Sequence, residues 1–295
     1  MNGARVWLLA ARPRTLPAAV APVLVGTALA GTLGTFKPLT FVATLLGAIL
    51  IQVGANLSND YSDARRGADT EDRLGPVRVT AGGLVPPKQV LIATYLAFGL
   101  AVLVGVYLVV TAGWQLLIVG AASILAGVLY TGGPRPYGYE GLGEVFVFLF
   151  FGLVAVTGTY FCQRQELTWE SFALAVPVGL LATAILVVNN VRDLETDRRA
   201  GKRTLAVRMG RGRTRALYAV LVYGAFLLAP VAWLAGGTGL SVWLLLPWLA
   251  LPLAARLVRL VRAKVDGPSL NGALAKTGML QLVFCVLLSI GLLAS

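Results

Sequence analysis

Two short segments hold most of the acidic side chains of this sequence. The first spans 56–73 and reads NLSNDYSDARRGADTEDR, and its acids are Asp60, Asp63, Asp69, Glu71 and Asp72. The second spans 189–201 and reads NNVRDLETDRRAG, and its acids are Asp193, Glu195 and Asp197. The chain has only 13 acidic residues among 295, so this concentration requires a local chemical explanation.

The Asn and Asp residues of each segment have the spacing of one helical face. Asn56, Asp60 and Asp63 lie at i, i+4 and i+7. In the second segment the residues on the corresponding face are Asn189, Asn190, Asp193 and Asp197. We therefore expect each segment to continue a preceding apolar helix by about two turns, with a stripe of amide and carboxylate oxygens along one side. Gly67 and Gly201 are the expected helix ends.

Such oxygen stripes suit a hard divalent cation. Carboxylates four residues apart on a helix repel each other, so two facing acidic stripes need a cation between them. Oxygen ligands without His or Cys are typical of Mg²⁺, which keeps one or two carboxylates and completes its shell with water and phosphate oxygens. The chain has no histidine, which excludes His-ligated haem, His-containing zinc sites and a histidine general base. The pattern predicts a diphosphate bridged by Mg²⁺ between the two segments.

Basic side chains near both segments can neutralise the remaining charge of a diphosphate. The candidates are Arg73, Arg78, Arg198, Lys202 and Arg203. The alternative is that these acids and bases are solvated loop residues, and we adopt it for Glu195, which lies off the stripe. For each arginine, the interpretation as a solvated loop residue stays open, because membrane topology also places basic residues in such loops. Two separate stripes with matching spacing favour a site for the Asn and Asp residues.

The elements that must position these residues are membrane-spanning helices. Hydrophobic residues make up 57% of the chain and charged residues 13%, whereas about a quarter of a soluble domain is charged. Apolar runs close to the ~20 residues that cross a bilayer recur along the chain. We predict an all-α polytopic membrane protein with nine transmembrane helices in one domain, 1–295. The expected spans are Leu16–Leu33, Leu39–Leu57, Val90–Val110, Trp114–Tyr130, Val145–Phe161, Phe172–Val188, Ala216–Gly236, Leu240–Ala255 and Thr277–Ala294.

The distribution of basic residues predicts the orientation of these spans. With the N-terminus in the cytoplasm and alternating spans, 23 of the 25 Lys and Arg residues fall on the cytoplasmic side. Only Lys37 and Arg164 fall on the other side. This asymmetry follows the positive-inside rule and supports an odd number of spans between the basic arms. Topology and an anionic lipid leaflet account for the net charge of +12, so no nucleic-acid partner is expected.

Four stretches resemble the UbiA superfamily of intramembrane aromatic prenyltransferases, whose mark is two Asp-rich motifs in these two loops of a nine-helix fold. They are RPRTLPAAVAPVLVGTALA (12–30), NDYSDARRGADTEDRLGPVRVTAGGL (59–84), YTGGPRPYGYEGLGEVFVFLFFGLVAVTGTY (130–160) and NNVRDLETDRRAGKRTLAVRMG (189–210). Within the superfamily they are most similar to the 1,4-dihydroxy-2-naphthoate polyprenyltransferases of menaquinone synthesis. Asp69 follows Asp63 by six residues rather than four, as in the naphthoate group, which weakens a 4-hydroxybenzoate assignment.

The resemblance implies a central cavity with cytoplasmic Asp-rich loops, and a role for each candidate residue. Binding of Mg²⁺ together with the diphosphate, with two ions expected, is assigned to Asn56, Asp60, Asp63, Asp193 and Asp197, and the four aspartates of this set are the expected catalytic residues. Weaker candidates for the same site are Asn59, Asn189 and Asn190. Lys202 and Arg203 would bind the diphosphate, and Arg73 and Arg78 the diphosphate or the carboxylate of the acceptor. The aromatic side chains expected to wall the pocket and shield a prenyl cation, unless they are membrane-interface aromatics, are Tyr130, Tyr137 and Tyr139.

The function implied is transfer of a polyprenyl group from a polyprenyl diphosphate to 1,4-dihydroxy-2-naphthoate. Diphosphate and CO₂ leave, and demethylmenaquinone is the product. A proton on the phenol could pass to Asp63 or Asp69, which the sequence does not decide. Menaquinone synthesis implies the plasma membrane of a prokaryote, with membrane lipid around the spans.

Two other functions compete with this one. The first is a prenyltransferase of the same superfamily with another aromatic acceptor, such as 4-hydroxybenzoate. The second is a transporter or lipid-binding membrane protein. The nearly pure apolar character of the middle of the spans argues against transport, because transporters carry polar or ionisable groups there.

Overall fold

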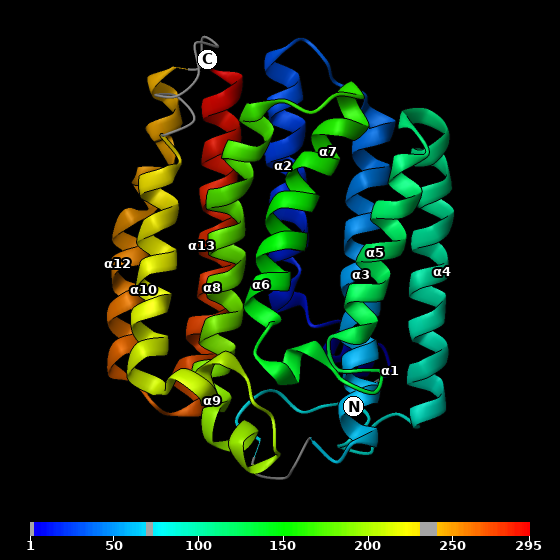
Figure 1. The fold of residues 1–295 in the computed structure, drawn as a ribbon, viewed down its shortest axis with the longest axis vertical. Helices are drawn as coiled ribbons and strands as arrows, with labels where there is room; N and C mark the ends of the chain where they lie inside the picture. Colours follow the sequence, from blue (N-terminus) through cyan, green and yellow to red (C-terminus); the bar gives the residue numbers. More distant parts are fainter. Residues whose placement is uncertain (1–2, 69–72, 231–240) are drawn as a thin grey trace.

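The computed structural model describes residues 3–68, 73–230 and 241–295. Within these residues every regular element is a helix, which confirms the predicted all-α class. A helix satisfies its own backbone hydrogen bonds, so it is the natural conformation for apolar runs that have no water around them. The elements form one set of roughly parallel helices along the long axis of the molecule (Figure 1).

Long helices joined by short connections make up most of the described chain. In chain order the elements are α1 (Gly3–Ala11), η1 (Pro13–Thr15), α2 (Pro17–Thr32), α3 (Pro38–Arg65), α4 (Pro87–Ala112), α5 (Gln115–Leu129), η2 (Tyr137–Glu140), α6 (Gly143–Val147), the π-helical η3 (Phe148–Val154), α7 (Ala155–Arg164), α8 (Trp169–Arg199), α9 (Leu205–Met209), α10 (Arg211–Leu228), η4 (Val242–Ala250), α12 (Leu251–Ala263) and α13 (Gly267–Leu293). Helices α6, η3 and α7 follow one another without a gap and form one continuous run.

Six helical runs in the described residues are long and apolar enough to cross a bilayer. They are α3, α4, the run α6–η3–α7, α8, the run η4–α12, and α13. A seventh results if the N-terminal arm and α2, which bend by 52°, count as one span. The chain is thus a multi-pass membrane protein, and nine spans stays a prediction. Residues 231–240, where the predicted seventh span ends and the eighth begins, lie outside the described part.

Successive helices run in opposite directions and bring the two acidic segments to one end of the molecule. The C-terminal ends of α3 and α8 lie at the end where α1 begins, and the C-terminus lies at the opposite end (Figure 1). Termini at opposite ends agree with an odd number of crossings. The acidic segments continue α3 and α8 themselves, as the residue spacing predicts.

Both acidic helices stop with the same C-terminal turn. Gly67 and Gly201 adopt left-handed φ angles of 64° and 74°. The N–H of the residue after each glycine donates to a carbonyl four positions before the glycine, namely that of Asp63 at 3.0 Å and that of Asp197 at 2.9 Å. This Schellman arrangement satisfies carbonyls at the helix end and requires the left-handed residue that glycine supplies. The two glycines are confirmed as helix stops.

Helix α8 forms the centre of the packing. In its apolar part 72% of the residues are buried, against 22% in α3 and 28% in α4. The larger apolar core joins α8 to α2, α7, α10 and α13, and a smaller core joins α1, α3 and α4. The outer helices α4 and α5 carry large exposed apolar side chains, among them Leu96, Leu103, Val110, Leu117 and Ile118, as expected for helices that face lipid.

The π-helical η3 crosses α8 at a pair of glycines. A Cβ atom at Gly152 would lie 2.5 Å from the Cα atom of Gly179, and one at Gly179 would lie 3.0 Å from the Cα atom of Gly152. Small residues permit this close approach of two backbones within a membrane. The crossing holds η3 against the helix that carries the second acidic segment.

We predict that Gly152→Ala lowers the stability of the protein by about 1–3 kcal/mol, because the added methyl group must push α8 away. Thermal unfolding in detergent micelles or nanodiscs measures the change. The matched control is Gly99→Ala in α4, where no atom lies within 4 Å of an added Cβ. Equal melting temperatures for both variants would contradict the tight crossing.

Candidate active site

A cavity of about 590 Å³ runs between the helices and ends at the two acidic segments. Along most of its length the wall is apolar, with contributions from Val106 of α4, Ile124 of α5, Phe150 of η3 and Ile185 of α8. At the end where α3 and α8 stop, the lining becomes polar. The charged side chains that line this end are Arg12, Asp63, Arg73, Arg78, Asp193, Asp197 and Lys202.

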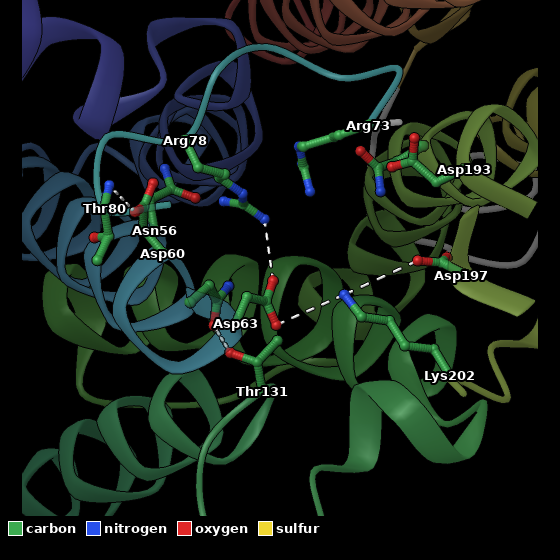
Figure 2. A network of polar contacts seen from close by, with 12 residues as sticks. Asn56, Asp60, Asp63, Arg73, Arg78, Thr80, Thr131, Asp193, Asp197 and Lys202 are labelled. Atoms are coloured by element: carbon green, nitrogen blue, oxygen red, sulfur yellow. Dashed lines mark hydrogen bonds and ion pairs between the residues drawn. The ribbon is translucent and has the colours of Figure 1, made fainter. Parts of the chain in front are cut away.

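Asp63 lies at the centre of the polar end. Its side chain is only 2% exposed, and it is contacted by three different segments. The hydroxyl group of Tyr139 donates to Oδ1 at 2.6 Å, and Nη2 of Arg78 donates to Oδ2 at 3.2 Å. The ammonium of Lys202 lies 3.6 Å from Oδ1 (Figure 2). Such partners compensate the cost of removing a carboxylate from water, and all three belong to the predicted set.

Lys202 connects the two acidic segments. Its Nζ atom is 3.6 Å from Oδ1 of Asp63 on α3 and 3.9 Å from Oδ1 of Asp197 on α8. The same ammonium lies over the ring of Tyr139, 4.7 Å from the ring centroid. One cation thus sits between carboxylates of both stripes (Figure 2), which is the charge arrangement that their mutual repulsion requires.

Asp60 differs from the sequence prediction. It is 1% exposed and does not belong to the cavity lining. Its two oxygens accept the backbone N–H groups of Val79 at 3.2 Å and Thr80 at 2.9 Å, and Arg12 lies 4.0 Å away. The structure therefore assigns Asp60 to anchoring the connection between α3 and α4. Its predicted places among the metal ligands and the catalytic residues gain no support.

The four asparagines of the two acidic segments all line the cavity, and three of them connect their helix to another segment through a hydrogen bond. Asn56 donates to the carbonyl of Ala11 at 2.9 Å, and Asn59 accepts from Thr131 at 2.9 Å. Asn190 donates to Oε1 of the buried Glu144 at 2.8 Å. Thr131 and Glu144 were not among the predicted site residues. The one signal in the sequence that could have identified Glu144 is its position, since this acidic residue directly follows a loop rich in glycine and aromatic residues.

Asp193 is held by its own neighbour in the sequence, Arg192. Nε of Arg192 donates to Oδ1 at 2.7 Å, Nη2 donates to Oδ2, and the same Nη2 donates to Oδ1 of Asn189 at 2.8 Å. Arg192 is 2% exposed. Arg192 was not among the predicted site residues, although a buried ionisable residue in a membrane helix is a signal of function.

Aromatic rings form one wall of the cavity next to the polar end. The rings of Tyr130 and Tyr137 meet edge to face at 5.5 Å, and the ring of Tyr137 stacks on Phe146 at 4.0 Å. Phe146 is followed along the same helical run by Phe150, with ring centroids 6.2 Å apart. Tyr130, Tyr137 and Tyr139 all line the cavity as predicted. Phe146 and Phe150 extend this wall and were not singled out from the sequence.

Some of the remaining basic and acidic candidates line the cavity, whereas others are exposed outside it. Arg73 and Arg78 line the cavity. Arg203 is exposed and does not line it, so the predicted contact of this side chain with diphosphate is not supported. Arg198 is exposed and pairs with Glu195 at 3.1 Å, which confirms Glu195 as a solvated charge. Asp69 lies outside the described residues.

The residues at the polar end fit a magnesium ion that shares its shell with a substrate. In the described ranges no group of three or more His, Cys, Asp or Glu side chains is close enough to hold a metal alone. The oxygens that line the cavity come from Asp63 on one side and from Asp193 and Asp197 on the other. Such a set of few carboxylates, amide oxygens and no nitrogen or sulfur ligand suits Mg²⁺ bound together with phosphate.

Comparisons with known proteins agree with this arrangement. The model of the UbiA prenyltransferase family matches residues 19–292. The 1,4-dihydroxy-2-naphthoate octaprenyltransferase of Mycobacterium tuberculosis is 43% identical over 280 residues, 95% of this chain and 94% of that protein. The enzyme of the same name from Escherichia coli is 38% identical, covering 99% of this chain and 96% of that protein.

Solved structures show the same fold. A UbiA homolog from Archaeoglobus fulgidus bound to DMAPP and Mg²⁺ superposes with a TM-score of 0.70 at 14% identity, covering 98% of this chain and 99% of that one. A UbiA homolog from Aeropyrum pernix K1 gives a TM-score of 0.70 at 12% identity, covering 95% and 97%. From the family match and the near full-length relatives, the chain belongs to the UbiA prenyltransferase family.

Proposed function

We propose that this protein transfers a polyprenyl group from a polyprenyl diphosphate to 1,4-dihydroxy-2-naphthoate in menaquinone synthesis. The observation that carries the proposal is a single cavity with a long apolar wall and one strongly ionic end. An apolar tail and a charged diphosphate head have this same distribution of polarity. The relatives named for the naphthoate reaction cover nearly the whole chain, which supports naphthoate over 4-hydroxybenzoate as the acceptor.

The polar end is suited to hold a diphosphate and to stabilise it as a leaving group. Lys202, Arg73 and Arg78 line this end and can place positive charge on phosphate oxygens. Asp63, Asp193 and Asp197 would hold Mg²⁺, and we propose two ions. A bound magnesium ion supplies charge neutralisation on the departing diphosphate. The Archaeoglobus fulgidus homolog bound to DMAPP and Mg²⁺ supports this use of a divalent metal.

The aromatic wall is placed to protect the prenyl cation that remains when diphosphate leaves. Tyr130, Tyr137 and Phe146 line the cavity next to the ionic end. The π faces of aromatic rings attract a cation without acting as nucleophiles, and their bulk excludes water. The apolar wall beyond them, on α4, α5 and η3, accommodates the rest of the isoprenoid chain.

In the next step the acceptor ring attacks the prenyl cation and takes up the prenyl group. The C–O bond of the prenyl diphosphate breaks, and its electron pair leaves with the diphosphate. The ring carbon that carries the carboxylate forms the new C–C bond to the prenyl carbon. The bond to the carboxylate breaks, CO₂ leaves, and its electron pair restores the aromatic ring. The direct product is the quinol form of demethylmenaquinone, so the transfer itself needs no oxidant.

We propose that the ionic end faces the cytoplasm of a prokaryotic cell. The basic residues of the chain gather in the segments at this end, leaving only Lys37 and Arg164 for the other. Under the positive-inside rule that end stays in the cytoplasm. Both substrates can then approach from one side, the acceptor from water and the prenyl tail from the bilayer.

The substrate assignment is tested with purified protein in nanodiscs. We expect 1,4-dihydroxy-2-naphthoate, a polyprenyl diphosphate and Mg²⁺ to yield a prenylated quinol with one CO₂ per product, and a chelator to abolish the reaction. Parallel reactions contain 4-hydroxybenzoate in place of the naphthoate. Prenylation of 4-hydroxybenzoate but not of the naphthoate would overturn the acceptor assignment.

The role of the acidic stripe is tested with Asp63→Asn, which keeps the shape of the side chain and removes its charge. We expect a loss of activity of about 100-fold or more, because both the ion pair to Lys202 and a metal ligand are lost. The matched control is Glu195→Gln on α8, whose exposed carboxylate pairs with Arg198 and Arg211 away from the cavity. Comparable activity in both variants would remove Asp63 from the site.

The role of Lys202 is tested with Lys202→Met, which keeps an unbranched side chain as far as Cε and removes the ammonium group. We expect the KM for polyprenyl diphosphate to rise by about tenfold or more, because a charged hydrogen bond to phosphate is lost. Arg203→Gln changes the next residue in the sequence, and we expect less than about a twofold effect on KM because that side chain is exposed outside the cavity. A larger effect at Arg203 than at Lys202 would contradict the division of roles between these two neighbours.

A further inference from the structure

The segment 73–80 crosses the polar end of the cavity and contributes its two arginines to the lining there. It belongs to the connection between α3 and α4, and both Arg73 and Arg78 line the cavity. On the α3 side the segment is held by Asp60, which accepts backbone N–H groups at Val79 and Thr80, and by the ion pair between Asp63 and Arg78. These contacts fix only one end of the segment.

The other end of the segment is docked on the C-terminal helix α13. Nδ2 of Asn271 donates to the carbonyl oxygen of Leu74 at 2.8 Å. Leu74 also packs on the first turn of this helix, where a Cβ atom at Gly267 would lie 3.1 Å from the Cβ atom of Leu74. Asn271 is thus a polar contact between a helix that carries no motif and the segment that carries Arg73.

The amide of Asn271 is bonded in two directions. While its nitrogen donates to Leu74, its oxygen accepts from Nη1 of Arg192 at 2.7 Å. Arg192 is the buried guanidinium that holds Asp193 and Asn189. A continuous series of hydrogen bonds therefore runs from Asp193 through Arg192 and Asn271 to the backbone at Leu74.

The backbone of the segment also lies directly against this guanidinium. A Cβ atom at Gly75 would lie 2.9 Å from Nη2 of Arg192 and 3.1 Å from Nη2 of Arg73. The glycine lets both guanidinium groups lie close beside the chain, and a larger residue would have to displace them. Neither Arg192 nor Asn271 lines the cavity, so both act on the site through the residues that they hold.

We propose that Arg192 and Asn271 are positioning residues that fasten the segment 73–80 to the second acidic segment. Asn271 sets the place of Leu74 and thereby aims Arg73 at the diphosphate, while Arg192 orients Asp193 and Asn189. The inference rests on the proposed function only in taking a diphosphate as the ligand.

The test uses two substitutions at Asn271 in the full-length protein in nanodiscs. Asn271→Ala removes both hydrogen bonds. Asn271→Asp keeps the size and the acceptor for Arg192 but loses the donor to Leu74, so it separates hydrogen bonding from packing. The control is Gln281→Leu on the same helix, whose buried amide contacts the carbonyl of Val178 and lies away from the segment.

Two measurements are independent of the acceptor. The first is the rate of trypsin cleavage after Arg73 and Arg78 without ligand, followed by mass spectrometry. The second is the affinity for inorganic diphosphate with Mg²⁺, by calorimetry. For both Asn271 variants we expect faster cleavage after Arg73 and weaker diphosphate binding, each by about fivefold, the size of one lost hydrogen bond. We expect cleavage after Arg78 to stay at the wild-type rate, because Asp60 holds that end of the segment. We expect KM for the prenyl diphosphate to rise while kcat changes by less than about threefold, and Gln281→Leu to match the wild type.

Wild-type cleavage rates and diphosphate affinity in Asn271→Asp would overturn the inference, because the hydrogen bond to Leu74 would then have no positioning role. A purely structural role for Asn271 would instead lower the melting temperature and leave both measurements unchanged in the folded fraction. If the wild type bound diphosphate but did not prenylate the naphthoate, the proposed function would fail while this inference could still stand.

Discussion

Two acidic helix ends can share one cavity only if positive charge lies between them. Lys202 supplies that charge, 3.6 Å from Asp63 and 3.9 Å from Asp197. Two unit charges about 4 Å apart attract each other by ~4 kcal/mol at the effective dielectric near a protein surface, and the cost of removing both charges from water offsets much of this attraction. Without the cation that cost would remain and the carboxylates would repel each other, so the charge balance of the two segments is a condition that this end of the fold has to satisfy. It also explains why a diphosphate that arrives with magnesium suits the same place.

The remaining buried charges are distributed so that they connect different segments. Asp60 binds the backbone at Val79 and Thr80, and Arg192 binds Asp193, Asn189 and Asn271. A buried ion without partners costs several kcal/mol, so such pairs maintain the fold even when they add little net stability. The free-energy cost of burying these charges is accepted where the ion pairs and hydrogen bonds hold the residues of a site in position. The result is a polar layer that connects α3, α8 and α13 at the end of the molecule where the two acidic segments lie.

The apolar part of the molecule serves the same site by different means. Helix α8 is the most buried of the long helices, and the glycine crossing with η3 keeps the aromatic wall close to it. Helices α4 and α5 face outward and carry exposed apolar side chains, and both contribute to the cavity wall. In the proposed function the inner and outer walls would enclose an isoprenoid tail, with its far end toward the bilayer. The close packing next to the ionic end would limit the access of water to the prenyl cation.

Features that depend on neighbouring residues could be predicted from the sequence, whereas features that depend on distant contacts could not. The apolar runs, the Asn and Asp spacing and the glycine stops follow from helical periodicity and local backbone preference. They were sufficient to place Asp63, Asp193, Asp197 and Lys202 at one site. The direction of each side chain depends on which segment packs against it. Asp60 shares a helical face with Asp63, yet it turns to the backbone of a loop, and Arg203 follows Lys202 but lies outside the cavity. Asn271, 79 residues from Arg192 in the chain, meets it only because α13 packs on α8.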